Sequence, residues 1–135
     1  MQFVIAAGSE LPIYRQLMRQ ITDGIAGGRL RPGDKLTSQR ELAQQLVIAP
    51  LTVKKAYDEL EREGLIRTER GRGTFVTTSA SPLDPREQRE RLRDPARRLL
   101  SRAHLGGVSL AELVSLLQEL SAELQSERLS EEDRP

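Results

Sequence analysis

The chain lacks cysteine and tryptophan, has a single histidine, and contains only 3% aromatic residues among its 135 positions. The absence of cysteine excludes a disulfide framework, thiolate chemistry and cysteine-ligated metal sites. One histidine, His104, cannot form a multi-histidine metal site, and we interpret it as a helix-capping or surface residue. Any core must therefore be built from Leu, Ile, Val and Ala.

Long hydrophobic runs are also missing. No stretch of about 18 apolar residues is present, so the sequence predicts no transmembrane helix. The first ten residues lack a basic segment, and their apolar stretch is too short for a secretory signal. We therefore expect a cytoplasmic protein.

No constellation of catalytic residues can be found. The carboxylates are scattered along helical segments, mostly close to Arg or Lys, as in solvated ion pairs. The turn at residues 70–73, Arg-Gly-Arg-Gly, lacks the glycine spacing of phosphate-binding loops and dinucleotide-binding motifs. The sequence predicts neither an enzyme nor a cofactor, and no feature identifies a small effector.

The charges are unevenly distributed, although the net charge is only +1. Residues 1–79 hold twelve Lys and Arg against nine Asp and Glu, a net of +3. Residues 80–135 hold nine against eleven, a net of −2, and their acids are concentrated after residue 105. A basic front half suits a chain whose first part meets an anion.

Residues 37–76 have the pattern of two short helices followed by a hairpin. Ser38 with Glu41 forms a capping box that opens the first helix, and Pro50 suits the first turn of the second. The second helix should end at Gly64, a residue that tolerates the left-handed conformation after a helix. Helix, turn, helix and hairpin is the layout of a winged helix-turn-helix, which places its second helix in the DNA major groove.

The segments on either side complete this N-terminal part. A helix is predicted from Pro12 to the Gly27-Gly28 pair, because apolar residues recur there every four positions. Residues 3–5 form either a short strand or an arm, and residues 35–37 a minimal strand. The hairpin strands are expected at 65–69 and 74–78.

Exposed side chains on the second helix and the hairpin tip can contact DNA. Lys54 and Lys55 can bond guanine or phosphate, and Leu51 can touch a thymine methyl. A Lys-Lys pair taken alone favours a solvated helix face, but arginines at a glycine-rich tip suit a narrow minor groove. The candidate DNA-binding residues are Ser38, Arg40, Pro50, Leu51, Thr52, Lys54, Lys55, Arg70, Gly71, Arg72 and Gly73.

A small, mostly polar segment ending in Pro82 contains nothing that can anchor a core, so we place a domain boundary there. Asp84-Pro85 opens a helix, and Asp94-Pro95 opens or kinks another, giving one bent helix or two short ones over 84–104. The predicted organisation is a winged domain at 1–77, a linker at 78–84, a helical dimerisation segment at 85–128 and a disordered acidic tail at 129–135.

The last helical segment carries a long leucine stripe. Ser109 with Glu112 forms a second capping box, and apolar residues then repeat at helical spacing. Part of this stripe must pack on the preceding helix, but two helices have too little core to stand alone, and a second copy is the natural completion. The expected dimerisation residues are Leu99, Leu110, Leu113, Val114, Leu117, Leu120 and Leu124.

Residues 11–77 contain an ordered set of motifs: Pro12-Ile13-Tyr14 with Gln16, Leu30 through Pro32-Gly33-Asp34 to Leu36, Ser38 with Arg40-Glu41-Leu42-Ala43, Thr52-Val53 with Ala56-Tyr57, Leu60-Glu61 with Glu63-Gly64-Leu65-Ile66, and Gly71-Arg72-Gly73-Thr74-Phe75-Val76. With these motifs, about half of the chain resembles the N-terminal DNA-binding domain of GntR-family bacterial transcription regulators. The short two-helix C-terminal part resembles that of the YtrA-like subfamily, whose tail serves dimerisation.

The resemblance implies that Arg40 contacts DNA from the first helix of the motif. It places Thr52 and Lys54 on the recognition helix and Arg70 and Gly71 at the wing tip.

The sequence departs from the family pattern at the turn between the two helices. Thr37 stands where proline is usual, and Val47-Ile48-Ala49 replaces a glycine, a valine and a polar cap. Loss of the glycine implies a different backbone path or strain, and Ala49 removes an expected N-cap and phosphate contact. Pro50, where many relatives carry arginine, fits the YtrA-like group. These changes bear on the operator sequence more than on the fold.

The expected fold class is mainly α with a small β-hairpin: an N-terminal winged helix-turn-helix plus a C-terminal helical dimerisation segment. The leading functional hypothesis is a homodimeric repressor that binds an inverted repeat in double-stranded DNA. The alternative is an adaptor module that joins a partner protein through the winged domain and the leucine-rich helix. The glycine-flanked arginines argue against this alternative.

Overall fold

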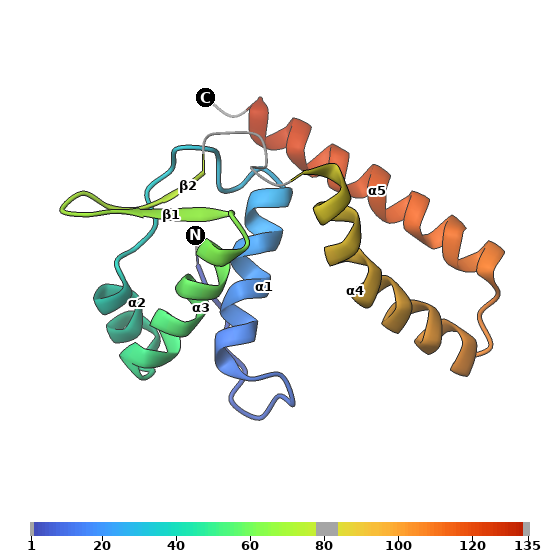
Figure 1. The fold of residues 1–135 in the computed structure, drawn as a ribbon, viewed down its shortest axis with the longest axis horizontal. Coiled ribbons are helices and arrows are strands. Elements are labelled where there is room, and N and C mark those ends of the chain that lie inside the picture. The colour runs from blue at the N-terminus through green and yellow to red at the C-terminus, as the bar shows by residue number, and fades with distance from the viewer. Residues whose placement is uncertain (1, 78–83, 134–135) are drawn as a thin grey trace.

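The computed structural model describes residues 2–77 and 84–133. Five elements form an N-terminal domain, and two long helices form a hairpin beside it (Figure 1). Mainly helical structure with one antiparallel β-hairpin confirms the expected fold class. The elements are α1 (Ile13–Ala26), α2 (Gln39–Leu46), α3 (Pro50–Arg62), β1 (Ile66–Glu69), β2 (Gly73–Val76), α4 (Pro85–Leu105) and α5 (Leu110–Glu132).

The apolar stripes of the three N-terminal helices meet in one core. Leu17 and Ile21 of α1 and Leu60 of α3 are fully buried, and α1 and α2 both pack against α3. The hairpin closes this core through Ile66 and Val76, which face each other across the two strands. The spacing of apolar residues thus predicted the helices and their inner faces correctly.

The segment before α1 is an arm. The side-chain amide of Gln20 bonds the backbone N–H and carbonyl of Val4 at 2.9 and 2.8 Å. Gln16 bonds the N–H and carbonyl of Ala6 in the same way, at 2.8 and 2.9 Å. These side chains supply the hydrogen bonds that a neighbouring strand would offer to the backbone. Of the two forms expected for residues 3–5, a short strand or an arm, the structure therefore shows the arm.

The β structure is slightly smaller than expected. The minimal strand at residues 35–37 is reduced to a single bridge between Lys35 and Phe75. The second hairpin strand ends at Val76, and residue 78 lies outside the described residues. Thr77 leaves the strand, and its hydroxyl donates to the carbonyl of Gly64 or Leu65, at 2.9 and 3.1 Å.

The C-terminal part is a helical hairpin. The segment 84–104 is one helix, α4, which contains Pro95 in its interior and is capped by the Asp84 side chain. Gly106 and Gly107 end it, and the Ser109–Glu112 capping box opens α5 as predicted. No helix in residues 2–77 or 84–133 has the length and apolar character needed to cross a membrane.

The expected disordered tail is wrong for residues 129–132, which are the last turn of α5. This end of α5 contacts the loop after α1: Arg29 lies 3.6 Å from Glu127, and the Arg31 guanidinium donates to the Glu131 carbonyl. The contact between Arg31 and Glu131 joins residues that are 100 positions apart in the sequence. A local sequence pattern cannot predict such a contact, which stabilises the last turn of α5. The linker expected at 78–84 falls outside the described residues except for Asp84.

Candidate nucleic-acid interface

The start of α2 is fixed from two sides. The Ser38 hydroxyl accepts a hydrogen bond from the Glu41 N–H at 3.1 Å, which confirms the predicted N-cap. The Tyr57 hydroxyl of α3 donates to the Thr37 carbonyl at 2.6 Å, and burial raises the pKa of Tyr57 to about 12. Arg40 lies on the first turn of α2, next to this fixed N-terminus, and its side chain is exposed.

The turn between α2 and α3 is strained. Val47 adopts φ 54° and ψ 51°, and it is the only non-glycine residue with positive φ in the described part of the chain. A β-branched side chain is disfavoured there because its Cβ crowds the following carbonyl. The absence of the turn glycine implied either a different backbone path or strain in the turn, and the structure shows strain.

The first turn of α3 has no polar cap. Ala49 is the N-cap residue, and no side chain bonds the free N–H groups, as its identity predicted. Pro50 and Leu51 are exposed and Thr52 is half-buried. The end of α3 that enters the groove in this class of motif therefore presents mainly apolar atoms.

The two lysines of α3 are held in different ways. Lys54 Nζ lies 2.6 Å from a carboxylate oxygen of Asp58. Lys55 Nζ lies 4.2 Å from the centre of the Tyr14 ring, toward α1. A hydrogen bond from Arg15 lowers the pKa of Tyr14, and the positive charge of Lys55 acts in the same direction. The structure therefore places Tyr14 and Arg15 of α1 next to Lys55, an arrangement that the sequence did not predict.

The hairpin tip presents arginines on a glycine-shaped turn. Glu69 pairs with Arg67 at 2.8 Å and with Arg72 at 3.6 Å, whereas Arg70 forms no salt bridge with any described residue. Gly71 has φ 78° with open space around it, so its conformation, rather than crowding, calls for glycine.

Gly73, at the base of the tip, also calls for glycine through its backbone conformation, because its φ is 127°. A Cβ at this position would lie 2.7 Å from Cε of Lys35, which is the flexible end of a side chain and can move away.

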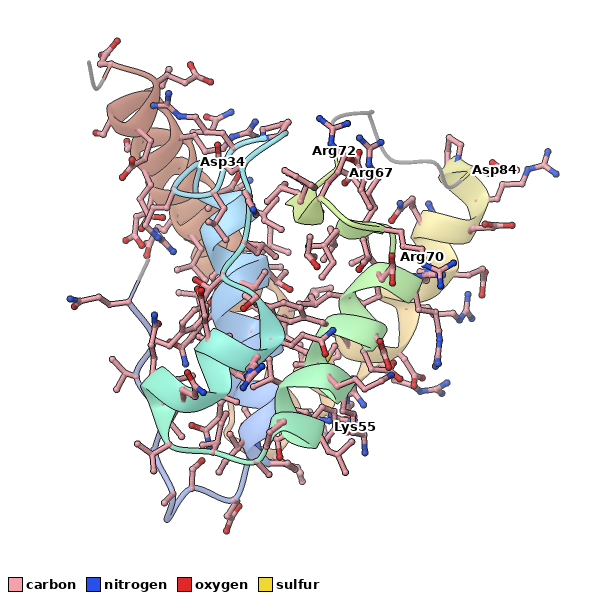
Figure 2. The ribbon with its side chains drawn as sticks, turned by 90° about the vertical axis from the view of Figure 1, so that its left-hand side faces the viewer. Asp34, Lys55, Arg67, Arg70, Arg72 and Asp84 are labelled. Carbon is pink, nitrogen blue, oxygen red and sulfur yellow. The ribbon has the colours of Figure 1, made fainter. Side chains whose placement is uncertain are left out.

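The hairpin arginines and Lys55 share one face of the molecule (Figure 2). Figure 2, which looks at the side that carries the hairpin tip, shows Arg67, Arg70 and Arg72 on the hairpin and Lys55 lower down on α3. Arg67 was not predicted, although its alternation with Glu69 along an exposed strand is a usable signal. Among the described residues, no three His, Asp or Glu side chains are grouped to hold a metal ion.

An exposed second helix, a basic hairpin tip beside it and a buried three-helix core define a winged helix-turn-helix DNA-binding protein. Residues 13–76 match the family model for bacterial regulatory proteins of the gntR family. The chain belongs to this family and is of its YtrA type, a DNA-binding transcription regulator.

Known proteins resemble it over different shares of its length. It is 40% identical over 117 residues to the HTH-type transcriptional repressor YtrA of Bacillus subtilis (strain 168), covering 87% of this chain and 90% of the relative. A crystal structure of a transcriptional antiterminator from Listeria monocytogenes EGD-e is similar over 92% of both chains, with TM-score 0.80 and 33% identity. The DNA-binding domain of AraR in complex with operator ORX1 is similar over 57% of this chain and 96% of that one, with TM-score 0.51 and 30% identity.

Proposed function

We propose that the protein is a dimeric repressor that binds an inverted-repeat operator. The observation that carries the dimer is an incomplete apolar face on α5. Leu113 on this face is only 3% exposed, whereas Leu117, Leu120 and Leu124 on the same face are 40–48% exposed. A hairpin that buries one leucine in a row of four has a surface that a second copy can complete.

The other expected dimerisation residues, apart from Leu113, are exposed as well. Leu99, Leu110 and Val114 are 39%, 66% and 43% exposed. Leu113 differs, because it is already buried within the chain and is therefore not accessible to a second copy. The proposed interface therefore consists of Leu99, Leu110, Val114, Leu117, Leu120 and Leu124.

Two copies related by a twofold axis would present two recognition helices to two half-sites. Arg40, Thr52 and Lys54 would contact base edges or phosphates in the major groove, with Ser38, Pro50 and Leu51 around them. The tip residues Arg70, Gly71, Arg72 and Gly73 would enter the flanking minor groove, and Lys55 would approach phosphate from the α1 side. Arg70 is the most available of the tip arginines, since Glu69 holds Arg72.

Repression, as opposed to activation, is supported by the small size of the protein and by the repressor YtrA at 40% identity. A short helical hairpin offers little surface for recruiting polymerase. Occupying an operator is sufficient to block transcription.

Fluorescence anisotropy with the full chain tests the proposal. We expect affinity for DNA from its own promoter to exceed that for random duplex by more than about tenfold, at salt where non-specific binding fades. A smaller ratio of the two affinities would contradict the proposal that the protein binds DNA sequence-specifically. Size-exclusion chromatography with light scattering should show a dimer at the same concentration.

A matched pair of variants tests the site. Lys54→Ala should weaken operator binding about tenfold and reduce the preference over random duplex. Arg102→Ala, which removes an exposed cation on α4, should leave both affinities unchanged. Equal effects of the two substitutions would exclude Lys54 from the interface.

The adaptor reading predicts a different outcome. It requires that the full chain shows no DNA affinity and forms a stable complex with another protein. The arginines on the hairpin, Arg67, Arg70 and Arg72 (Figure 2), favour DNA.

A further inference from the structure

The turn before α3 and the first turn of α3 form an apolar surface on the DNA-facing side of the motif. From Leu46 to Leu51, no side chain contains a hydrogen-bonding atom. Four of these residues are exposed, and Leu51 is 76% exposed. We call them the apolar turn surface: Val47, Ala49, Pro50 and Leu51.

The fold does not account for this surface. The buried side of α3 begins at Val53, and Leu51 lies two positions earlier, about 200° around the helix and so on the opposite side. Val47 is 89% exposed and occupies a backbone conformation that glycine would adopt without strain. Neither side chain is buried in the core, so both are accessible to an external partner.

The surroundings indicate what this contact is. A hollow of about 480 Å³ is lined by Val47, Ala49 and Pro50 together with Arg40 and the polar side chain of Gln44. A cation beside apolar atoms fits a partner that carries negative charge and a small apolar group. Duplex DNA offers both, since thymine alone presents a methyl group in the major groove beside the phosphates.

We propose that Leu51 reads the 5-methyl group of a thymine, so that each operator half-site has a thymine facing the first turn of α3. Ala49 and Pro50 complete the apolar contact, and Thr52 and Lys54 supply hydrogen bonds further along the helix. This inference rests on the proposed function and deepens it by assigning one base of the operator. The missing polar cap at Ala49 belongs to the same arrangement, because the position contributes a methyl group in place of a hydroxyl.

Deoxyuridine provides the test, because it pairs as thymine does and lacks only the methyl group. An operator duplex is first selected from random duplexes with the full chain. Thymines of both half-sites are then replaced by deoxyuridine, one symmetric pair at a time. At one position we expect a loss of about fourfold for each methyl group removed.

Variants assign this loss to Leu51. Leu51→Ala should bind the thymine and deoxyuridine duplexes equally, whereas Leu51→Met should keep the preference for thymine. Leu105→Ala removes a leucine that is 85% exposed at the other end of the molecule, and it should keep the full preference. A helical circular dichroism spectrum unchanged from that of the parent confirms that each variant is folded.

The outcomes separate this inference from the function on which it rests. If the chain prefers the selected duplex to random duplex but no deoxyuridine replacement weakens binding, thymine reading is overturned and the regulator remains. If Leu51→Ala keeps the preference for thymine, the methyl group is read by another residue and the assignment to Leu51 is overturned. If the chain does not prefer the selected duplex to random duplex, the proposed function itself is contradicted, and the thymine contact with it.

Discussion

The two halves of the described chain use leucine in opposite ways. Twelve of the thirteen buried hydrophobic residues lie in the winged domain, and the α4–α5 hairpin contributes only Leu113. The hairpin nevertheless carries a row of leucines at helical spacing along α5. The winged domain buries most of its large apolar side chains in its own core, whereas the hairpin leaves most of its leucines exposed.

This contrast predicts the largest effect in the winged core. Leu60→Ala should lower the free energy of unfolding by about 3 kcal/mol, because it leaves a cavity between α3 and its neighbours. Urea denaturation followed by circular dichroism measures the change. Leu105→Ala is the control and should stay within about 0.5 kcal/mol, since its side chain is exposed. Equal losses would remove the distinction between the two halves.

Charge on the hairpin should disrupt assembly and leave the winged domain folded. The double substitution Leu117→Glu with Leu120→Glu should yield a monomer in sedimentation velocity, with operator affinity lower by about 100-fold through lost bivalency. Ser115→Glu with Ser126→Glu adds the same charge to the opposite face of α5 and should remain dimeric. A dimer that survives the first substitution would move the interface elsewhere.

The buried hydroxyl of Tyr57 makes the winged domain sensitive to alkaline pH. Its pKa is raised to about 12 in the folded chain, above about 10 in an unfolded chain. The folded state therefore holds the proton more tightly. The stability from this group is complete below pH 10 and falls by about 1.4 kcal/mol per pH unit between pH 10 and 12.

Tyr57→Phe removes both the hydrogen bond to Thr37 and the alkaline dependence. At pH 8 we expect a loss of about 1.5 kcal/mol. The difference in unfolding free energy between parent and variant should shrink as the pH rises from 10 to 12. A constant difference over that range would show that the hydroxyl does not titrate with unfolding.

The turns of the two halves differ in the residue that adopts positive φ. The hairpin turn uses Gly107 at φ 74°, whereas the turn between α2 and α3 uses Val47 at φ 54°. Val47→Gly should stabilise the chain by about 1 kcal/mol, seen as a higher Tm. Val47→Ala keeps the Cβ and should gain less, so equal gains would show that the branched side chain, not the backbone conformation, is the source of strain.

The smallest effect on stability concerns the ion pair on α3. Lys54 and Asp58 are both about half exposed, so that Asp58→Asn should change the unfolding free energy by less than about 0.5 kcal/mol. Operator affinity should rise several-fold, because Lys54 is released and a negative charge leaves the DNA-facing side. Glu132→Gln, at the end of α5, is the control and should not change affinity. Weaker binding of Asp58→Asn would show that the carboxylate positions Lys54.

Much of the winged domain could be predicted because its signals are local. The Ser38 cap, the proline at the start of α3 and the glycine after it each act within a few residues, and each was confirmed. Ala49 showed in advance that α3 would lack a side-chain cap. The exposure of Arg40 and of both lysines followed from the helical period.

The parts that were missed depend on distant contacts. The arm is set by Gln16 and Gln20, whose amides could equally have faced solvent. Lys55 turns toward Tyr14, which belongs to another helix, and Glu69 selects which tip arginine stays unpaired. The continuity of α4 through Pro95 also lay beyond the sequence, because a proline can either end a helix or be accommodated within it.

The sequence by itself determined the order of the elements, the apolar face of each N-terminal helix and the family to which the chain is similar. These properties arise from periodicity and capping, which operate over a few residues. Tertiary structure decided which leucines are buried, since Leu113 is 3% exposed whereas most of the stripe on α5 is exposed. It also decided that the turn between α2 and α3 is strained at Val47: both helices pack into one core, and the short turn that joins them places Val47 at φ 54°.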